Sequence, residues 1–196
     1  QPDMILLPGT KSTIADLRWL RQSGLEAAVN KAASAGVLVF GICGGFQMLG
    51  RSISDPEGAE ADPIAGIGLL DVDTVFRGEK VQAQTTGTFG PVPGPLEGLE
   101  GLRYQGYEIH MGRGGEGLPP LVSRGNVYGS YIHGIFDAPG IADAVVKALC
   151  IRKGIDFTQV GTFDLAEYKE RQYDLLADAV RAGLDMDLIY RVLEGR

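Results

Sequence analysis

The stretch VLVFGICGGFQMLG, residues 37–50, decides the fold, because it joins an apolar run, a cysteine among glycines and a helical pattern. The four apolar residues 37–40 are typical of a buried strand. Cys43 follows, with Gly41 and Gly45 two residues to either side. This spacing is that of a nucleophile elbow, a sharp turn with no room for side chains beside the nucleophile. The stretch therefore predicts a thiol presented at the carboxyl end of a strand.

The segments before this stretch predict a parallel pair of strands. MILLP, residues 4–8, is a short apolar run bounded by a Pro-Gly pair, which favours a strand. A helix capped by Ser12 or Thr13 and a second helix over residues 25–35 separate it from the strand at residues 37–40. Two strands joined through helices lie parallel, with a right-handed crossover.

The rest of the chain completes an α/β pattern in one domain, residues 1–196. Alternating apolar and polar residues over residues 66–89 predict a hairpin that turns at residues 77–79. Further strands are expected at RYQGYEIHMG (103–112) and NVYGSYIHG (126–134), and helices at residues 142–153, 165–182 and 186–193. We expect a mostly parallel central sheet with helices on both faces and an antiparallel section at one side.

Composition narrows the class of function. The 196 residues carry 25 acidic and 18 basic side chains, a net charge of -7, so a nucleic-acid partner is not expected. Apolar runs are too short for a membrane span, and two cysteines cannot form a disulfide framework. These features favour a cytoplasmic protein that acts on a small molecule. Because the chain starts at Gln1 and enters a strand almost at once, we interpret it as a piece of a longer protein.

A thiol nucleophile needs a proton shuttle, and the sequence has two histidines. His133 follows the apolar segment VYGSYI, which would place it at a strand end on the same rim of the sheet as Cys43. His110 lies inside the alternating segment YEIH. Either histidine could instead have a structural, hydrogen-bonded role. Cys150 lies in a helical segment without a tight turn and is expected to be a packed core residue.

The anion formed when a thiolate attacks an amide requires hydrogen-bond donors. The N–H of Gly44 follows the nucleophile directly, and a second donor is expected from Gly9 or Thr10 in the first strand-to-helix loop, unless that loop is a plain turn. The helix N-terminus after Cys43 would favour its thiolate. The segment around Lys11 lacks the earlier glycine of a phosphate-binding loop, so ATP binding here has no support.

Several segments together resemble one family. LPGTKSTIADLRWLR, GICGGFQMLG, GYEIHMGR, YIHGIFD and RQYDLLADAVRAGLDMDLIYRVL are similar to the C-terminal glutamine amidotransferase domain of cobyric acid synthases, in the class I amidotransferase superfamily. The resemblance spans almost the whole chain. It implies a flavodoxin-like fold, a glutamyl thioester on Cys43 and proton relay by His133. It also implies that Gln47, Glu108 and His110 lie near bound glutamine.

The resemblance also implies what surrounds this domain. No cofactor or metal is expected in the domain itself. In the full-length family an N-terminal synthetase domain uses ATP and Mg²⁺ to activate corrinoid carboxylates, and ammonia passes to it. Its acceptor there is adenosyl-cobyrinic acid a,c-diamide, which is amidated at four side chains to give cobyric acid.

One position departs from the wider superfamily pattern. Members with a full triad carry Glu two residues after the histidine, but here that position is Ile135. The cobyric branch is similar in lacking this Glu. We therefore expect a dyad of Cys43 and His133. Asp137 and Glu108 are candidates for an orienting carboxylate, although Asp137 could equally cap the next helix.

Three alternatives stay open from sequence. The same glutaminase chemistry could serve another acceptor, as in cobyrinic acid a,c-diamide synthase or a cell-wall amidotransferase. The chain could be a non-catalytic binding module that keeps the fold. It could also be another elbow-cysteine α/β protein, such as a small hydrolase or redox chaperone, although LPGTKSTIADL and YEIHMG have no place in that interpretation.

Overall fold

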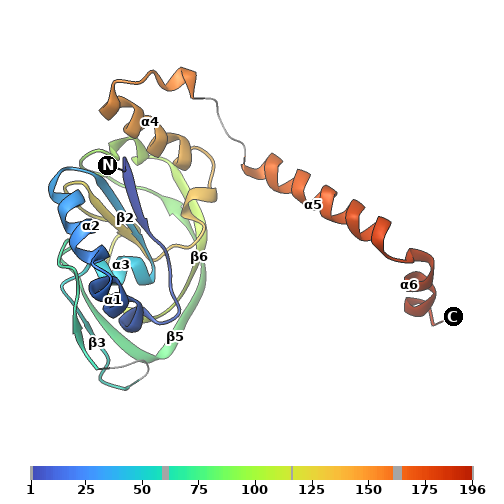
Figure 1. Cartoon of the computed structure of the whole chain (residues 1–196), viewed down its shortest axis with the longest axis horizontal. Coiled ribbons are helices and arrows are strands. Elements are labelled where there is room, and N and C mark those ends of the chain that lie inside the picture. The colour runs from blue at the N-terminus through green and yellow to red at the C-terminus, as the bar shows by residue number, and fades with distance from the viewer. Residues whose placement is uncertain (1, 59–61, 116, 161–164, 196) are drawn as a thin grey trace. The chain divides into compact units, whose positions relative to one another are not determined.

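The computed structural model describes residues 2–58, 62–115, 117–160 and 165–195. It divides into two compact units, Gln1–Val160 and Gly161–Arg196, which are drawn together in Figure 1 and described separately below.

The central sheet of the first unit has the strand order β1-β2-β8-β7. β1 (Met4–Leu7) pairs in parallel with β2 (Leu38–Ile42), and β2 pairs in parallel with β8 (Val127–Ser130). β7 (Val122–Arg124) is antiparallel to β8 at one edge. The expected strands at residues 4–8 and 37–40 and their parallel pairing are confirmed.

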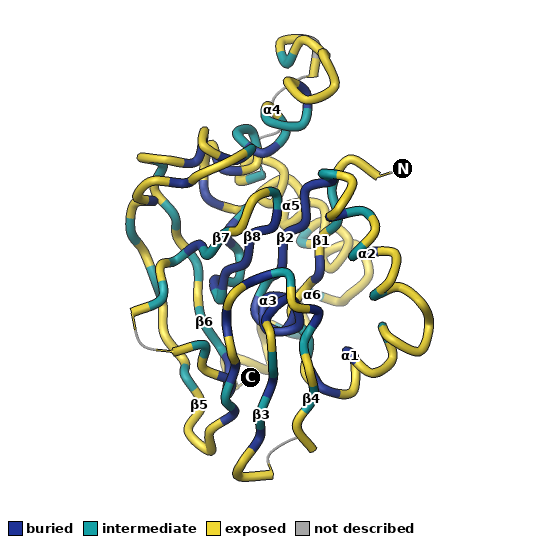
Figure 2. Tube along the Cα trace, turned by 90° about the vertical axis from the view of Figure 1, so that its left-hand side faces the viewer, coloured by how far each residue is buried: buried dark blue, intermediate teal, exposed yellow. Residues whose placement is uncertain are grey.

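Helices cover both faces of this sheet. α1 (Thr13–Gln22) and α2 (Leu25–Ser34) connect β1 to β2, and α3 (Gly44–Leu49) follows β2 after one residue. α4 (Ile141–Lys153) belongs to the core on the opposite face. Alternation along β2 explains the two cores, because Val39 packs into the first, whereas Leu38 and Phe40 pack into the second. Figure 2 shows β2 and α3 as the buried centre of the unit. The α/β prediction is confirmed.

A second sheet has the order β4-β3-β5-β6 and supplies the antiparallel section. It consists of β4 (Ile64–Ala65), β3 (Ser52–Ser54), β5 (Asp73–Thr88) and β6 (Arg103–Arg113). β5 and β6 form a long antiparallel ribbon, visible along one side of the unit in Figure 1.

The predicted hairpin at residues 66–89 is wrong. Residues 77–79 do not turn the chain; they lie within the single strand β5, whose register against β6 shifts between Phe76 and Val81. Two contacts explain this. β6 pairs with β5 from Val81 to Thr88, and the N–H of Gly78 donates a hydrogen bond to Glu57 Oε2 at 2.6 Å. The Gly78 N–H thus has a long-range acceptor, and the strand pairs with β6 on either side of residues 77–79, so the chain continues without a local turn.

The second unit consists of α5 (Leu165–Gly183) and α6 (Met186–Leu193), close to the expected boundaries. Asp185 caps α6, because its carboxylate accepts a hydrogen bond from Leu188 N at 2.9 Å. No described residue of either helix is buried. Within the described part of the chain, no helix has the length and apolar character to cross a membrane.

Candidate active site

Cys43 lies in the turn between β2 and α3. Its backbone has φ 49° and ψ -108°, and among the described residues it is the one non-glycine residue with a positive φ. Such a conformation is costly and persists where the surrounding structure imposes it. The hydrogen bond from Cys43 N to Ser130 O, at 2.8 Å, ties the turn to the end of β8. The elbow geometry expected from sequence is therefore present.

The flanking glycines are required by close backbone approach. A Cβ on Gly45 would lie 2.1 Å from the carbonyl oxygen of Leu7, and a Cβ on Gly41 would lie 2.7 Å from the Gly45 backbone. Real Cβ atoms do not come this near to a backbone, so neither position can carry a side chain. The glycines let β1, β2 and α3 meet at Cys43.

The Cys43 thiol is in its neutral form at neutral pH. Burial raises the pKa of Cys43 to about 11, outweighing the hydrogen bond from the Gly44 N–H, which lowers this pKa. Glu108 raises the pKa further through its charge. The sequence-based expectation of a stabilised thiolate is thus wrong for the resting site, because burial dominates. Its Sγ donates to Ile109 O at 3.7 Å, so a base has to remove the proton during attack.

His133 lies beside Cys43 but not on a strand. β8 ends at Ser130, so the prediction that the strand reaches His133 is wrong. Instead, His133 forms an isolated antiparallel bridge with Tyr107. A Cβ on Gly9 would lie 2.8 Å from His133 Cε1 and 3.6 Å from Cys43 Cβ, so the imidazole and the cysteine flank one glycine. The structure therefore brings together Cys43, His133 and Gly9, which the sequence analysis predicted to lie at one site.

The surroundings of His133 keep its imidazole neutral at neutral pH. Burial lowers the pKa of His133, the nearby His110 lowers it further, and Glu108 raises it. Its buried Nε2 has no hydrogen-bond partner within the described residues. A neutral imidazole with an unengaged nitrogen has the properties of a general base.

We predict an acid limb at unusually low pH for thiol reactivity. The imidazolium cannot accept the Cys43 proton, so reactivity falls as the pH drops through the pKa of His133, which lies below its ordinary value. The midpoint of this fall should therefore lie below the ordinary histidine pKa of about 6.5. The measurement is the rate of Cys43 modification by a glutamine analogue from pH 4.5 to 8. A midpoint above 6.5 would contradict the assignment.

The backbone of Thr10 lies close to Gly44. The backbone N of Thr10 lies 3.0 Å from the position of a Cβ on Gly44. The hydroxyl of Thr10 donates to Asp16, which fixes the loop against α1. Ser12 occupies the cap position of α1 but makes no side-chain capping bond. The loop from Gly9 to Thr10 is therefore held against the elbow, where the oxyanion donors were expected.

Gln47 is a buried brace between three segments. Its Oε1 accepts from Thr13 Oγ1 at 3.2 Å, and its Nε2 donates to Gly112 O at 3.2 Å. It connects α3 to α1 and β6, and it lines the same cavity as Cys43. The position agrees with an expected location near bound glutamine, but both ends of its amide already have protein partners.

We expect Gln47→Leu to destabilise the fold. The change leaves the Thr13 hydroxyl buried without this partner, whereas the Gly112 carbonyl keeps its bond from His110 Nδ1, so we expect a cost of about 1–3 kcal/mol in the free energy of unfolding. Urea denaturation would measure the loss. Gln22→Leu, at an exposed position of α1, is the matched control and should change stability little. A small loss for Gln47→Leu would contradict the bracing role.

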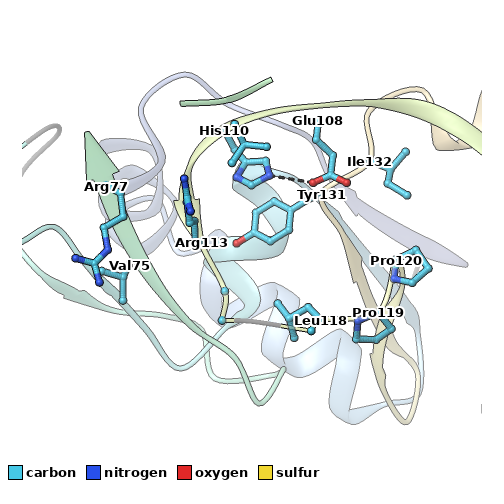
Figure 3. Close-up of a pocket in the computed structure, with 14 residues that line it drawn as sticks. Val75, Arg77, Glu108, His110, Arg113, Leu118, Pro119, Pro120, Tyr131 and Ile132 are labelled. Carbon is cyan, nitrogen blue, oxygen red and sulfur yellow. Dashed lines mark hydrogen bonds and ion pairs between the residues drawn. The ribbon is translucent and has the colours of Figure 1, made fainter. Parts of the chain in front are cut away.

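Glu108 and His110 form a pair on β6, shown in Figure 3. Nδ1 of His110 lies 2.7 Å from Gly112 O and therefore donates to it, while Nε2 lies 3.1 Å from Glu108 Oε2. The His110 ring stacks on Tyr131 with centroids 4.0 Å apart. Glu108, proposed from sequence as an orienting carboxylate, thus bonds to His110, although its charge also acts on His133.

Two cavities adjoin this pair. The Cys43 cavity measures about 610 Å³ and is lined by Thr10, Gln47, Lys80, His110 and Met111 among others. The second, about 540 Å³, is the one in Figure 3, where Glu108, His110 and Tyr131 lie opposite Leu118 and Pro119. His110 lines both cavities. The cavity with the thiol has room for an amino-acid substrate.

Asp137 ends the short 3₁₀ helix Ile135–Asp137 that follows His133. Its N–H donates to Gly134 O at 2.9 Å, so this turn fixes the backbone just after the histidine. No described group of three or more His, Cys, Asp or Glu side chains is arranged to hold a metal ion.

Comparison with known proteins places this geometry in a family. The model of the family described as "CobB/CobQ-like glutamine amidotransferase domain" matches residues 1–141, which include the elbow, Gly9 and His133. The chain belongs to this family. The resemblance noted in the sequence is therefore confirmed at the level of the domain.

Similar curated proteins are longer cobyric acid synthases. The chain is 51% identical to cobyric acid synthase of Lachnoclostridium phytofermentans, over 99% of this chain and 43% of that protein. It is 44% identical to the enzyme of Ruminiclostridium cellulolyticum, over 98% of this chain and 41% of that protein. The chain thus spans less than half the length of these relatives. A crystal structure of glutamine amidotransferase matches with a TM-score of 0.48 and 20% identity, over 78% of this chain and 80% of that one.

Sequence reasoning missed two aromatic residues that stack on the histidines of the candidate site. Tyr107 stacks on His133, and Tyr131 stacks on His110. Burial raises the pKa of Tyr131 to about 12, so it stays a neutral phenol. Tyr107 directly precedes Glu108 and Tyr131 lies two residues before His133, but a strand sequence does not say which rings meet across it.

Proposed function

We propose that this chain is the glutaminase domain of a cobyric acid synthase, which hydrolyses glutamine at Cys43 and supplies ammonia for amidation of corrinoid carboxylates. The observation that carries the proposal is the strained elbow of Cys43 with His133 on the other side of Gly9. Similarity to cobyric acid synthases over nearly the whole chain supports the choice of acceptor.

In this proposal the geometry performs acyl transfer in two steps. His133 takes the Cys43 proton as Sγ attacks the side-chain amide carbon of glutamine. The N–H groups of Gly44 and of Thr10 or Gly9 hold the resulting oxyanion. The imidazolium returns its proton to the leaving nitrogen, so ammonia departs and a glutamyl thioester remains. Water, deprotonated by His133, then attacks the thioester and releases glutamate.

The remaining residues shape the site. His110 lines the Cys43 cavity, and its partner Glu108 lines the adjoining cavity, which His110 also lines. Burial keeps the thiol protonated until a substrate is bound and the base acts, which limits side reactions of a free thiolate. We assign the catalytic roles to Cys43 and His133 on this basis.

The partners follow from the relatives' greater length. We propose an N-terminal synthetase domain of the same full-length protein, which binds ATP, Mg²⁺ and the corrinoid acceptor adenosyl-cobyrinic acid a,c-diamide. No step of the glutaminase mechanism proposed above requires ATP or a metal ion. Cys43 must stay reduced to react, and both cysteines are free, which agrees with a cytoplasmic location.

The test is intact mass after incubation of the full-length protein with a diazo-ketone analogue of glutamine. We expect one adduct, blocked by excess glutamine and lost in Cys43→Ser. An adduct at Cys43 that glutamine does not block would favour a different substrate. No adduct in the full-length, folded protein would contradict the proposal and favour a non-catalytic binding module.

The acceptor needs its own measurement. Full-length protein with ATP, Mg²⁺, glutamine and adenosyl-cobyrinic acid a,c-diamide should yield a corrinoid with four new amides by mass spectrometry. Glutamate release with no change in that corrinoid would leave the glutaminase assignment intact and overturn the acceptor.

A further inference from the structure

We infer that Tyr107 is a positioning residue for His133, supplying by ring stacking the orientation that a third catalytic carboxylate would otherwise supply. The inference rests on the proposed function, in which His133 moves protons to and from Cys43. Tyr107 is not among the residues that line the Cys43 cavity.

The need for such a residue comes from position 135. The side chain there is Ile135, which is 1% exposed and packs in the core with Phe40 and Tyr128. An isoleucine offers no hydrogen bond to an imidazole. His133 Nε2 is buried without a partner among the described residues, so hydrogen bonding at that nitrogen does not fix the ring. Another contact has to hold it.

Tyr107 makes that contact through both backbone and side chain. His133 N donates to Tyr107 O at 2.8 Å, and Tyr107 N donates to His133 O at 3.1 Å. Their rings lie almost parallel, at 7°, with centroids 5.0 Å apart. Paired hydrogen bonds fix the relative position of the two Cα atoms, and the stacked ring then restricts rotation of the imidazole. On the Cys43 side, the lack of a Cβ on Gly9 leaves just enough space for His133 Cε1.

The stacked ring of Tyr107 also stabilises the protonated form of His133. When His133 accepts the thiol proton, the resulting imidazolium lies over the face of an aromatic ring, an arrangement that stabilises cations. The other charged or titratable groups around it are Cys43, His110 and Glu108, with Asp137 on the following turn. His110 opposes the imidazolium, and Glu108 favours it. Tyr107 adds a favourable contact without adding a carboxylate beside the nucleophile, where negative charge would oppose the thiolate.

The exposure of Tyr107 makes the inference testable. The side chain is 42% exposed, so its truncation removes little of the core. Tyr107→Phe keeps the stacked ring, whereas Tyr107→Leu removes it and keeps a similar volume. Tyr104→Leu is the matched control, because Tyr104 lies on the same strand but packs against Phe89 instead of His133.

The first measurement is the rate of Cys43 alkylation by the diazo-ketone, against pH, in the full-length protein. For Tyr107→Leu we expect a plateau about tenfold lower and an acid limb moved to lower pH by about 0.5, since the imidazolium loses its aromatic partner. Tyr107→Phe should match the wild type. A lower plateau with an unmoved limb, shared by Tyr104→Leu, would indicate a merely structural role and overturn the inference.

The second measurement does not depend on activity. In the full-length protein, the Cε1 protons of His133 and His110 can be assigned by substituting each histidine in turn and then followed by NMR during a pH titration. Tyr107→Leu should lower the pKa of His133 and shift its Cε1 proton out of the ring current, whereas Tyr107→Phe should do neither. An unchanged titration of His133 in Tyr107→Leu would overturn the inference even where alkylation supports the proposed function. Absence of alkylation in the wild type would count against the function alone, and the titration would still decide the role of Tyr107.

Discussion

Replacing Cys43 by alanine is expected to lower glutamine-dependent amidation by the full-length protein by about 10⁴-fold or more, while amidation driven by added ammonium salt continues. The thiol is the nucleophile of the proposed mechanism, and no other described cysteine lies in the cavity. Ammonia added from solution bypasses the glutaminase step. The measurement is amidated corrinoid formed per minute with glutamine or with ammonium salt as the nitrogen source.

Cys150→Ala is the matched control. Cys150 is also buried and free, but it lies in α4, inside the core on the other face of the sheet. The substitution removes one sulfur from a packed site and should affect stability slightly and neither nitrogen source selectively. Loss of ammonium-driven amidation in a folded Cys43→Ala protein would show that the thiol serves the synthetase reaction as well, against the proposed division of labour.

Local chemistry explains why so much of the site could be predicted from sequence. The elbow depends on residues 41–45, and their small side chains directly reflect the approach of neighbouring backbone. The helices of the second unit were predicted to within one residue at their ends, because their apolar periodicity needs no distant partner. The parallel pair β1 and β2 followed from the crossover rule for strands joined through helices.

The features that the sequence predicted wrongly or did not reveal have a common cause, because each depends on contacts between distant segments of the chain. Residues 77–79 carry local turn signals, yet pairing with β6 on either side of them keeps them within the single strand β5. The helix N-terminus after Cys43 favours a thiolate locally, yet burial by distant segments raises the pKa of the thiol instead. Tyr107 acquires its position only when β6 meets the loop that carries His133. Such pairings have no signature within a single segment.

Gly9→Ala should uncouple the dyad without unfolding the protein. The new Cβ would lie 2.8 Å from His133 Cε1, closer than side chains pack, and 3.6 Å from Cys43 Cβ, an ordinary contact. The backbone of Gly9 does not have a positive φ, so alanine adopts its conformation without strain. The imidazole is the movable partner, and it must shift away from the thiol.

A shift of this kind is costly for proton transfer. Displacement of a catalytic group by about 1 Å reduces rates about a hundredfold, so we expect glutamate release by Gly9→Ala to fall by about that factor. The unfolding midpoint in urea should move far less than the activity. Gly90→Ala is the control, because a Cβ there would meet nothing within 4 Å. If Gly9→Ala kept full activity, the imidazole beside Gly9 could not be the proton shuttle, and the assignment of His133 would have to be given up.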